Sequence, residues 1–330
     1  MTKHGMRLSR ALGAGLLLAG LALLTPADAA SWPERTVRIV TSGAGASSDA
    51  VARTLAEGLS RRWNKPVVVE NRVGADHILA VQELINSRDG HTLLFVTHSA
   101  FTVNPLLHAK LPYDPVNDVS PISLVVEDFL CIVAAPSLGV NSLTDLVSLA
   151  RAKRGELNFF AVPGSPNLAF LAFQKRVDME ATFVPYRTAV PAIADLSEGR
   201  IQFAVLPLAS VLGQVQAGKL KLLAVTNSLR SPAAPETPTT AEVGFYEFTF
   251  GGLLGLFGPK SMAVEQRENI ASEIQAILAR TEVKQRLTNL GVVARGTSSA
   301  EFAAILDEQR AKWAAIARAH GIKPVSMTNP

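Results

Sequence analysis

Residues 36–70 read TVRIVTSGAGASSDAVARTLAEGLSRRWNKPVVVE, and this stretch decides the fold class. The β-branched run Thr36–Thr41 predicts a strand, and the small residues of Ser42–Ser48 predict a loop. Apolar residues four apart predict a helix over Asp49–Trp63, and the three valines of Pro66–Glu70 predict a strand buried on both faces. A strand–helix–strand unit of this kind predicts a right-handed crossover in a mostly parallel sheet.

The same alternation continues along the chain. Thr92–Thr97 predicts a third strand, and a second series begins near Phe129. Its strands are predicted at Leu157–Val162, Thr182–Pro185, Ile201–Leu206 and Leu220–Thr226. Late helices are predicted near Val264–Arg280 and Glu301–His320.

We therefore expect an α/β protein with two lobes, each a mostly parallel sheet flanked by helices. Two crossings, near 126–131 and 226–232, would join them. The first lobe is predicted to be discontinuous, comprising 30–128 plus 229–330, and the second lobe to comprise 129–228.

The first 29 residues have the build of a secretory signal. Basic residues precede an apolar stretch at Ala11–Leu24, and Ala27-Asp28-Ala29 supplies the small residues of a cleavage site. An uncleaved anchor helix is the alternative, although the stretch is short for a membrane span. Cleavage after Ala29 would deliver the chain to an exported compartment, where NAD and ATP pools are not expected.

Composition excludes several classes of function. Hydrophobic residues make up 48% and charged residues 18% of the 330 residues, which suits a packed core. The net charge of +4 is thinly spread, which argues against a nucleic-acid partner or a polybasic membrane patch. The single cysteine, Cys131, excludes an internal disulfide and a multi-cysteine metal site, and its apolar neighbours predict an inert core thiol.

Two glycine motifs resemble nucleotide-binding loops but fail in detail. Gly43-x-Gly45-x-x-Ser48 lacks the third glycine of a dinucleotide fingerprint, and Gly213–Lys219 is followed by leucine and ends a helix. Serine-hydrolase, Ser-x-x-Lys and His-Glu-x-x-His motifs are absent from the sequence. We expect no enzyme activity, no cofactor and no metal.

Two loops each open a helix after a strand. Ser42–Asp49 does so in the first lobe and Gly164–Asn167 in the second. Free N–H groups and the helix dipole favour an anion at such a point, so the pair predicts a carboxylate site; ordinary helix caps are the alternative. His77 and His98 also follow strands, where open α/β sheets gather ligands, although ordinary loop histidines would fit equally.

Several segments resemble the periplasmic solute receptors of the tripartite tricarboxylate transporter family, also called Bug receptors. They are Trp32–Val40, Pro66–Ala75, Asn104-Pro105, Leu111–Asp118, Val184–Arg187, Ala217–Leu220, Gly291 and the helix with Trp313. The resemblance covers essentially the whole mature chain. It implies a flytrap-like receptor in the periplasm that closes on a small organic acid and delivers it to integral-membrane permease subunits.

The resemblance also implies where the ligand lies. The first loop would hold its carboxylate, through Ser42, Gly43, Ala44, Gly45, Ala46, Ser47 and Asp49. Other loops would contribute His77, Thr97, His98, Ser99, Gly164, Ser165, Asn167, Tyr186, Arg187, Thr188 and Leu206. His98 and Arg187 would be charged contacts, and Leu206 would line an apolar wall.

The sequence departs from the family mainly in these loops. The first loop lacks the usual Pro-Phe start, Asp76-His77 replaces a glycine-rich continuation, and Leu206-Pro207-Leu208 replaces an acidic or amide-bearing stretch. These departures favour a mono- or dicarboxylate with an apolar or aromatic body. We expect a monomer that transports; a sensor for a membrane kinase and a periplasmic enzyme are the alternatives.

Overall fold

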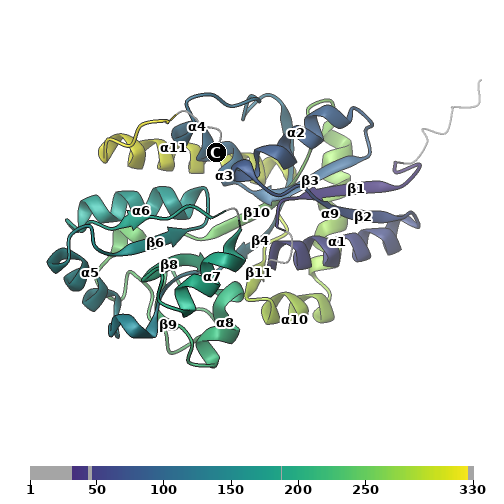
Figure 1. The fold of residues 1–330 in the computed structure, drawn as a ribbon. Coiled ribbons are helices and arrows are strands. Elements are labelled where there is room, and N and C mark those ends of the chain that lie inside the picture. Colours follow the sequence, from purple (N-terminus) through teal and green to yellow (C-terminus); the bar gives the residue numbers. More distant parts are fainter. Residues whose placement is uncertain (1–31, 44–46, 187, 326–330) are drawn as a thin grey trace, which may run out of the picture. The chain divides into compact units, whose positions relative to one another are not determined.

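A computed structural model describes residues 32–43, 47–186 and 188–325 (Figure 1). The described residues from Arg35 onward belong to one compact unit. The predicted signal segment therefore lies outside the described residues, as do Ala44, Gly45, Ala46 and Arg187 of the predicted site.

The first sheet has six strands in the order β11-β4-β10-β3-β1-β2. Their bounds are β1 Val37–Thr41, β2 Val67–Asn71, β3 Thr92–Thr97, β4 Val119–Asp128, β10 Gly252–Pro259 and β11 Val292–Ala294. Strand β1 pairs in parallel with β2 and β3. Strand β10 is antiparallel to β3 and β4, and β11 is antiparallel to β4.

The second sheet has five strands in the order β7-β6-β8-β5-β9. Their bounds are β5 Leu130–Ala134, β6 Asn158–Ala161, β7 Thr182–Phe183, β8 Phe203–Pro207 and β9 Lys221–Val225. Strand β6 is parallel to β7 and β8, whereas β5 is antiparallel to β8 and β9. The two sheets confirm the two-lobed α/β fold.

The expectation of mostly parallel sheets is wrong, because both sheets are mixed. Strand β4 leads from the first sheet into β5 of the second with only Phe129 between them. The returning chain enters β10 between β3 and β4 and runs antiparallel to both. Alternating strands and helices predict parallel pairs, but they carry no information on strands that pass directly between sheets.

Helices flank the strands, and the three helices with predicted bounds begin and end within two residues of them. The longer ones are α1 Ser47–Trp63, α2 Ile78–Ser87, α5 Leu143–Ala152, α6 Ser165–Arg176, α7 Ala189–Ser197, α8 Leu208–Gln216, α9 Val264–Leu278, α10 Thr281–Asn289 and α11 Ser299–Ala319. Short helices α3 Ser99–Thr102 and α4 Asn104–Leu107 follow β3. A capping box starts α11, because the side chains of Ser298 and Glu301 accept from each other's backbone N–H groups.

Strand β2 departs from its prediction. Its valines are half-buried or exposed rather than buried on both faces. The reason is position, since β2 is the edge strand of the first sheet and pairs only with β1. A run of valines does not distinguish a central strand from an edge strand.

Helix α11 contributes to two hydrophobic clusters. Phe302 and Leu306 pack with the first sheet's core, where the Phe302 ring lies 5.1 Å from that of Phe257. Trp313 and Ala317 instead pack in the second sheet's core, and Trp313 is only 1% exposed. Figure 1 shows α11 beside α3 and α6. The predicted lobe boundaries stay a prediction, but α11 belongs to both cores.

Across the described residues, no helix combines the length and apolarity that a membrane crossing requires.

Candidate functional site

The first three strands bring three loops to one edge of the sheet. Because β1 is parallel to both β2 and β3, their carboxyl ends lie together. Ser42 follows β1 directly, and His77 follows β2 after a short connection. The two side chains meet, with Ser42 Oγ 2.5 Å from His77 Nδ1.

The backbone before α2 is held in an unusual conformation. Gly74, Ala75, Asp76 and His77 all have positive φ, of 123°, 47°, 51° and 73°. For the three non-glycine residues this left-handed region costs about 1–3 kcal/mol each, so the surrounding structure must hold it. Such strain is concentrated at functional sites.

Two buried side chains fix this loop. Asn104 Nδ2 donates to the carbonyl oxygen of Asp76 at 2.8 Å, and Asn104 is fully buried. His108 Nε2 lies 2.8 Å from the Asp76 carboxylate. Asn104 and His108 were not predicted for the site, and Asp76 was predicted only as a departure from the family pattern; the available signal is the Asn104-Pro105 pair.

His77 is held in its neutral form. Burial lowers the pKa of its imidazole, and the opposing charge of Asp76 does not restore it. The direction of the bond to Ser42 depends on the tautomer of the neutral ring: either Ser42 donates to Nδ1 and Nε2–H is free to donate, or Nδ1–H donates to Ser42 and the Ser42 hydroxyl is free to donate. Ser42 and His77 therefore form a preorganised polar pair between the first two loops.

Asp49, in the first turn of α1, ties that helix to β2. Asn71 Nδ2 and Arg53 Nε each donate to its carboxylate at 2.8 Å. Partial burial opposes ionisation of Asp49, but these hydrogen bonds outweigh it and hold its pKa below the ordinary value. Asp49 thus supports the first loop, and its carboxylate oxygens already accept hydrogen bonds from Asn71 and Arg53.

His98 does not fit its predicted role as a charged contact. It is fully buried, and its Nδ1 lies 2.8 Å from Thr102 Oγ1. Burial, assisted by Lys312, lowers the pKa of His98 to about 3, so the ring is neutral. A histidine that follows a strand can point into the core as readily as toward a ligand.

The loop after β3 touches the start of α6 across the two sheets. Ser165 donates its backbone N–H to Ser99 Oγ at 3.1 Å, and the Ser99 and Ser165 hydroxyls are also 3.1 Å apart. Thr97 Oγ1 lies 3.3 Å from Ser99 Oγ. The structure therefore joins residues predicted for the site in both lobes.

The remaining predicted residues lie in the second lobe. Asn167, in the first turn of α6, has a buried Oδ1 without a hydrogen-bond partner within the described residues. The Tyr186 hydroxyl donates to Asp195 at 2.6 Å, and Thr188 is the N-cap of α7 without a side-chain bond. Leu206 is fully buried in the second lobe's core. In this structure it therefore does not line an apolar wall of the site, which corrects the prediction.

Cys131 confirms the prediction of a core thiol. It is fully buried, and its Sγ lies 3.4 Å from the carbonyl oxygen of Leu206. Burial raises the pKa of this thiol well above its ordinary value, which makes it unreactive. In the part of the chain that the structure describes, no three histidine, cysteine or acidic side chains gather as metal ligands would.

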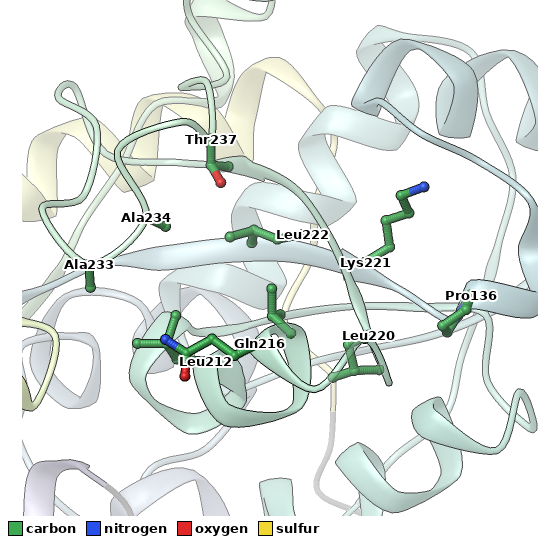
Figure 2. A pocket seen from close by; sticks show the side chains of 11 residues that line it. Pro136, Leu212, Gln216, Leu220, Lys221, Leu222, Ala233, Ala234 and Thr237 are labelled. Atoms are coloured by element: carbon green, nitrogen blue, oxygen red, sulfur yellow. The ribbon is translucent and has the colours of Figure 1, made fainter.

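Two surface cavities lie away from these residues. One, of about 580 Å³, is lined mainly by apolar side chains of α8, β9 and the loop after β9, including Leu212, Leu222 and Ala233 (Figure 2). The other, of about 470 Å³, is bordered by Leu229 and Tyr246. Neither is lined by a residue predicted for the site.

Known proteins resemble this chain over nearly its whole length. A UPF0065 protein of Bordetella bronchiseptica is 31% identical over 97% of this chain and 96% of its own, and BugT of Bordetella pertussis is 29% identical over 96% and 99%. Among solved structures, a Rhodopseudomonas palustris protein with adipate has a TM-score of 0.84 and 27% identity, covering 89% of this chain and 100% of its own. MatC of the same organism, with bound malate, has a TM-score of 0.79 and 26% identity, covering 86% and 99%.

The periplasmic binding protein BugD gives the same result, with a TM-score of 0.81, 26% identity and coverage of 89% of this chain and 100% of its own. The family model for the tripartite tricarboxylate transporter receptors matches residues 51–322. That match includes both sheets except β1, and most of the polar residues placed above. The chain is therefore a member of the tripartite tricarboxylate transporter receptor family, whose members are periplasmic solute-binding proteins.

Proposed function

We propose that this protein binds a small organic carboxylate in the periplasm and passes it to the permease subunits of a tripartite transporter. The observation that carries the proposal is the meeting of Ser99 and Ser165, because it joins the strand-end loops of both sheets. The relatives with adipate and malate support a carboxylate as the ligand class.

The hydrogen-bond donors at the edge of the first sheet where β1, β2 and β3 end are mostly uncharged. His77 and His98 are neutral, and Asp49 is already engaged by Arg53 and Asn71. A carboxylate would therefore be held by the one free donor of the Ser42–His77 pair, which is His77 Nε2–H or the Ser42 hydroxyl depending on the tautomer, and by backbone N–H groups that start α1 and α6. Neutral donors suit one or two carboxylates better than the three of a tricarboxylate.

The ligand would carry an apolar body. The first loop presents glycine and alanine from Gly43 to Ala46, which offer backbone groups and few polar side chains. Each additional polar group on the ligand would need a partner to offset its desolvation. The protein acts as a monomeric receptor and carries out no reaction on its ligand.

Thermal unfolding of residues 30–330 with a panel of acids tests this proposal. The panel holds adipate, malate, citrate, a medium-chain monocarboxylate and benzoate. A ligand at 100 times its dissociation constant should add about 2.7 kcal/mol of stability. We expect adipate or a more apolar acid to stabilise most and citrate least.

Two variants test whether the stabilising acid binds at the proposed site. Ser42→Ala removes the hydroxyl beside His77 and should weaken binding about tenfold, the cost of one hydrogen bond to a charged group. Ser60→Ala removes a hydroxyl of α1 that donates to the Lys65 carbonyl and should leave affinity unchanged. A folded protein that no carboxylate stabilises would contradict the proposal.

A further inference from the structure

Three chain segments run side by side where the chain passes between the sheets. The outgoing segment contains Asp128 and Leu130, and the returning chain contributes Thr226 and Phe250. Thr226 N–H donates to the Leu130 carbonyl at 2.9 Å, and Phe250 N–H donates to the Thr226 carbonyl at 2.7 Å. These segments carry the chain between the two sheets, and α11 packs against the cores of both.

Asn227 clamps the outgoing segment on both sides of Phe129. Its Nδ2 donates to the Asp128 carbonyl at 3.0 Å and to Glu127 Oε1 at 3.1 Å. Its Oδ1 accepts from the Leu130 N–H at 3.1 Å. One amide side chain thus fixes the relation between the last residues of β4 and the first residue of β5.

Two glycines make room for acidic side chains at this crossing. A Cβ on Gly252 would lie 1.6 Å from Asp128 Oδ1, and a Cβ on Gly251 would lie 2.6 Å from Glu127 Oε1. Asp128 is only 7% exposed, and its buried Oδ1 has no hydrogen-bond partner within the described residues. The Asp128 side chain is therefore packed against backbone, with one oxygen desolvated and unpaired.

This environment disfavours the charged form of the side chain. Burial first, and the neighbouring Glu127 second, raise the pKa of Asp128 to about 7, and they outweigh the backbone N–H groups of Asp128 and Gly252, which favour the charged form. Glu127 itself is paired with Arg295, whose Nη2 lies 2.9 Å away. From β5 the buried thiol of Cys131 stays neutral, and the partners opposite Asp128 on β10 and β11, Gly252 and Val292, carry no charge.

We propose that the protonation state of the Asp128 side chain controls the hinge between the two lobes. Its neutral carboxyl keeps the crossing packed as described, with Ser99 and Ser165 in contact. Its ionised carboxylate favours a rotation about residues 128–130 that admits water to the side chain. An ion-pair partner for Asp128 is absent among the described residues, so hydration is the way to relieve the buried charge.

The pH dependence of this hinge follows from the two pKa values of Asp128, in the packed and in the hydrated arrangement. Between the ordinary pKa of 3.8, which a hydrated side chain would have, and the pKa of about 7 in the packed arrangement, each unit of pH favours the hydrated arrangement tenfold; above about 7 the effect levels off. A ligand that prefers one arrangement must then take up or release a proton at Asp128, since the coupling is reciprocal. The hinge would link solute binding to periplasmic pH through a residue remote from Ser42 and His77.

Distance measurements between spin labels on the full mature chain test the proposal without any ligand. Asn86→Cys in α2 and Lys153→Cys at the end of α5 provide exposed labelling sites, one on each sheet's helices. Cys131 is fully buried and remains unlabelled. We expect the distance distribution to change progressively between about pH 4 and 7 and to stay constant above about 7, and Asp128→Asn to remain at the low-pH distribution throughout.

Glu127→Gln is the matched control. It removes the adjacent carboxylate but leaves Asp128 titratable, so the change should persist and level off at a lower pH. A wild-type distribution that is constant from about pH 4 to 8 would overturn the proposal, whether or not Asp128→Asn folds. An Asp128→Asn protein that shifts with pH as the wild type does would overturn it equally.

Discussion

The backbone N–H of Ser165 donates to the hydroxyl oxygen of Ser99 at 3.1 Å, which joins the loop after β3 to the first turn of α6. Gly164 permits this approach. Its φ is +89°, and a Cβ there would lie 2.5 Å from that of Ser99. The contact between the strand-end loops of the two sheets therefore depends on the absence of a side chain at position 164.

Gly164→Ala should separate these loops. The positive φ and the clash with Ser99 both oppose a methyl group, so we expect a loss of at least about 1 kcal/mol of stability and weaker carboxylate binding. Denaturant unfolding and calorimetric titration measure the two effects. Gly213→Ala, in α8 with open space around it, is the control and should be neutral or stabilising by about 0.5–1 kcal/mol. Equal behaviour of the two variants would refute the role of Gly164.

Asn104→Ala should loosen the strained loop before α2. The substitution leaves the Asp76 carbonyl without its buried donor, which costs about 1–3 kcal/mol. Affinity for the carboxylate should fall as well, because His77 loses its fixed position. Asn117→Ala, which removes an exposed bond to Asp114, should change stability by less than about 0.5 kcal/mol. Unchanged affinity in Asn104→Ala would show that the loop does not need this support.

Asp128 should make the protein less stable as the pH rises. Its pKa is about 7 in the folded chain against 3.8 ordinarily, so the folded state binds the extra proton between these values. Stability from this group is therefore lost on raising the pH through that window, by about 1.4 kcal/mol per unit. The free energy of unfolding of the wild type, relative to that of Asp128→Asn at the same pH, should decrease progressively from about pH 4 to 7. A constant difference in stability between the two proteins would contradict the raised pKa of this buried carboxyl.

Trp313→Ala should destabilise the whole chain. The ring is buried against the second sheet's core, where it lies 6.0 Å from Phe250, while the same helix packs Phe302 on the first sheet. Removing a buried tryptophan costs about 3–5 kcal/mol, measured by denaturant unfolding. Leu229→Ala, at a residue 75% exposed, should cost less than about 0.5 kcal/mol. A loss below about 1 kcal/mol for Trp313→Ala would mean that α11 is not a shared element.

The sequence predicted the elements whose residues repeat with a local period. The boundaries of β1, α1, β3 and α11 lie within two residues of their predicted positions. Strand β4 was not predicted, since Pro121 interrupts it and its partners β10 and β11 come from far along the chain. Local periodicity carries no record of such long-range antiparallel pairing.

The site was predictable only in part. The pairing of Ser42 with His77 follows from two parallel strands that end together, and both residues were predicted. The direction of His98 and Leu206 into the core was not predictable, because each follows or ends a strand and can face either way. The hinge role of Asp128 depends on Gly252 and Asn227, which lie about a hundred residues or more away along the chain.

A crystal structure of the mature chain with its most stabilising carboxylate tests the central claim most directly. We predict the carboxylate within hydrogen-bond distance of the loop that begins at Ser42, with the rest of the ligand against the start of α6 near Ser165 and Asn167. A ligand seated instead in the apolar cavity beside Leu212 and Ala233 would contradict the account (Figure 2).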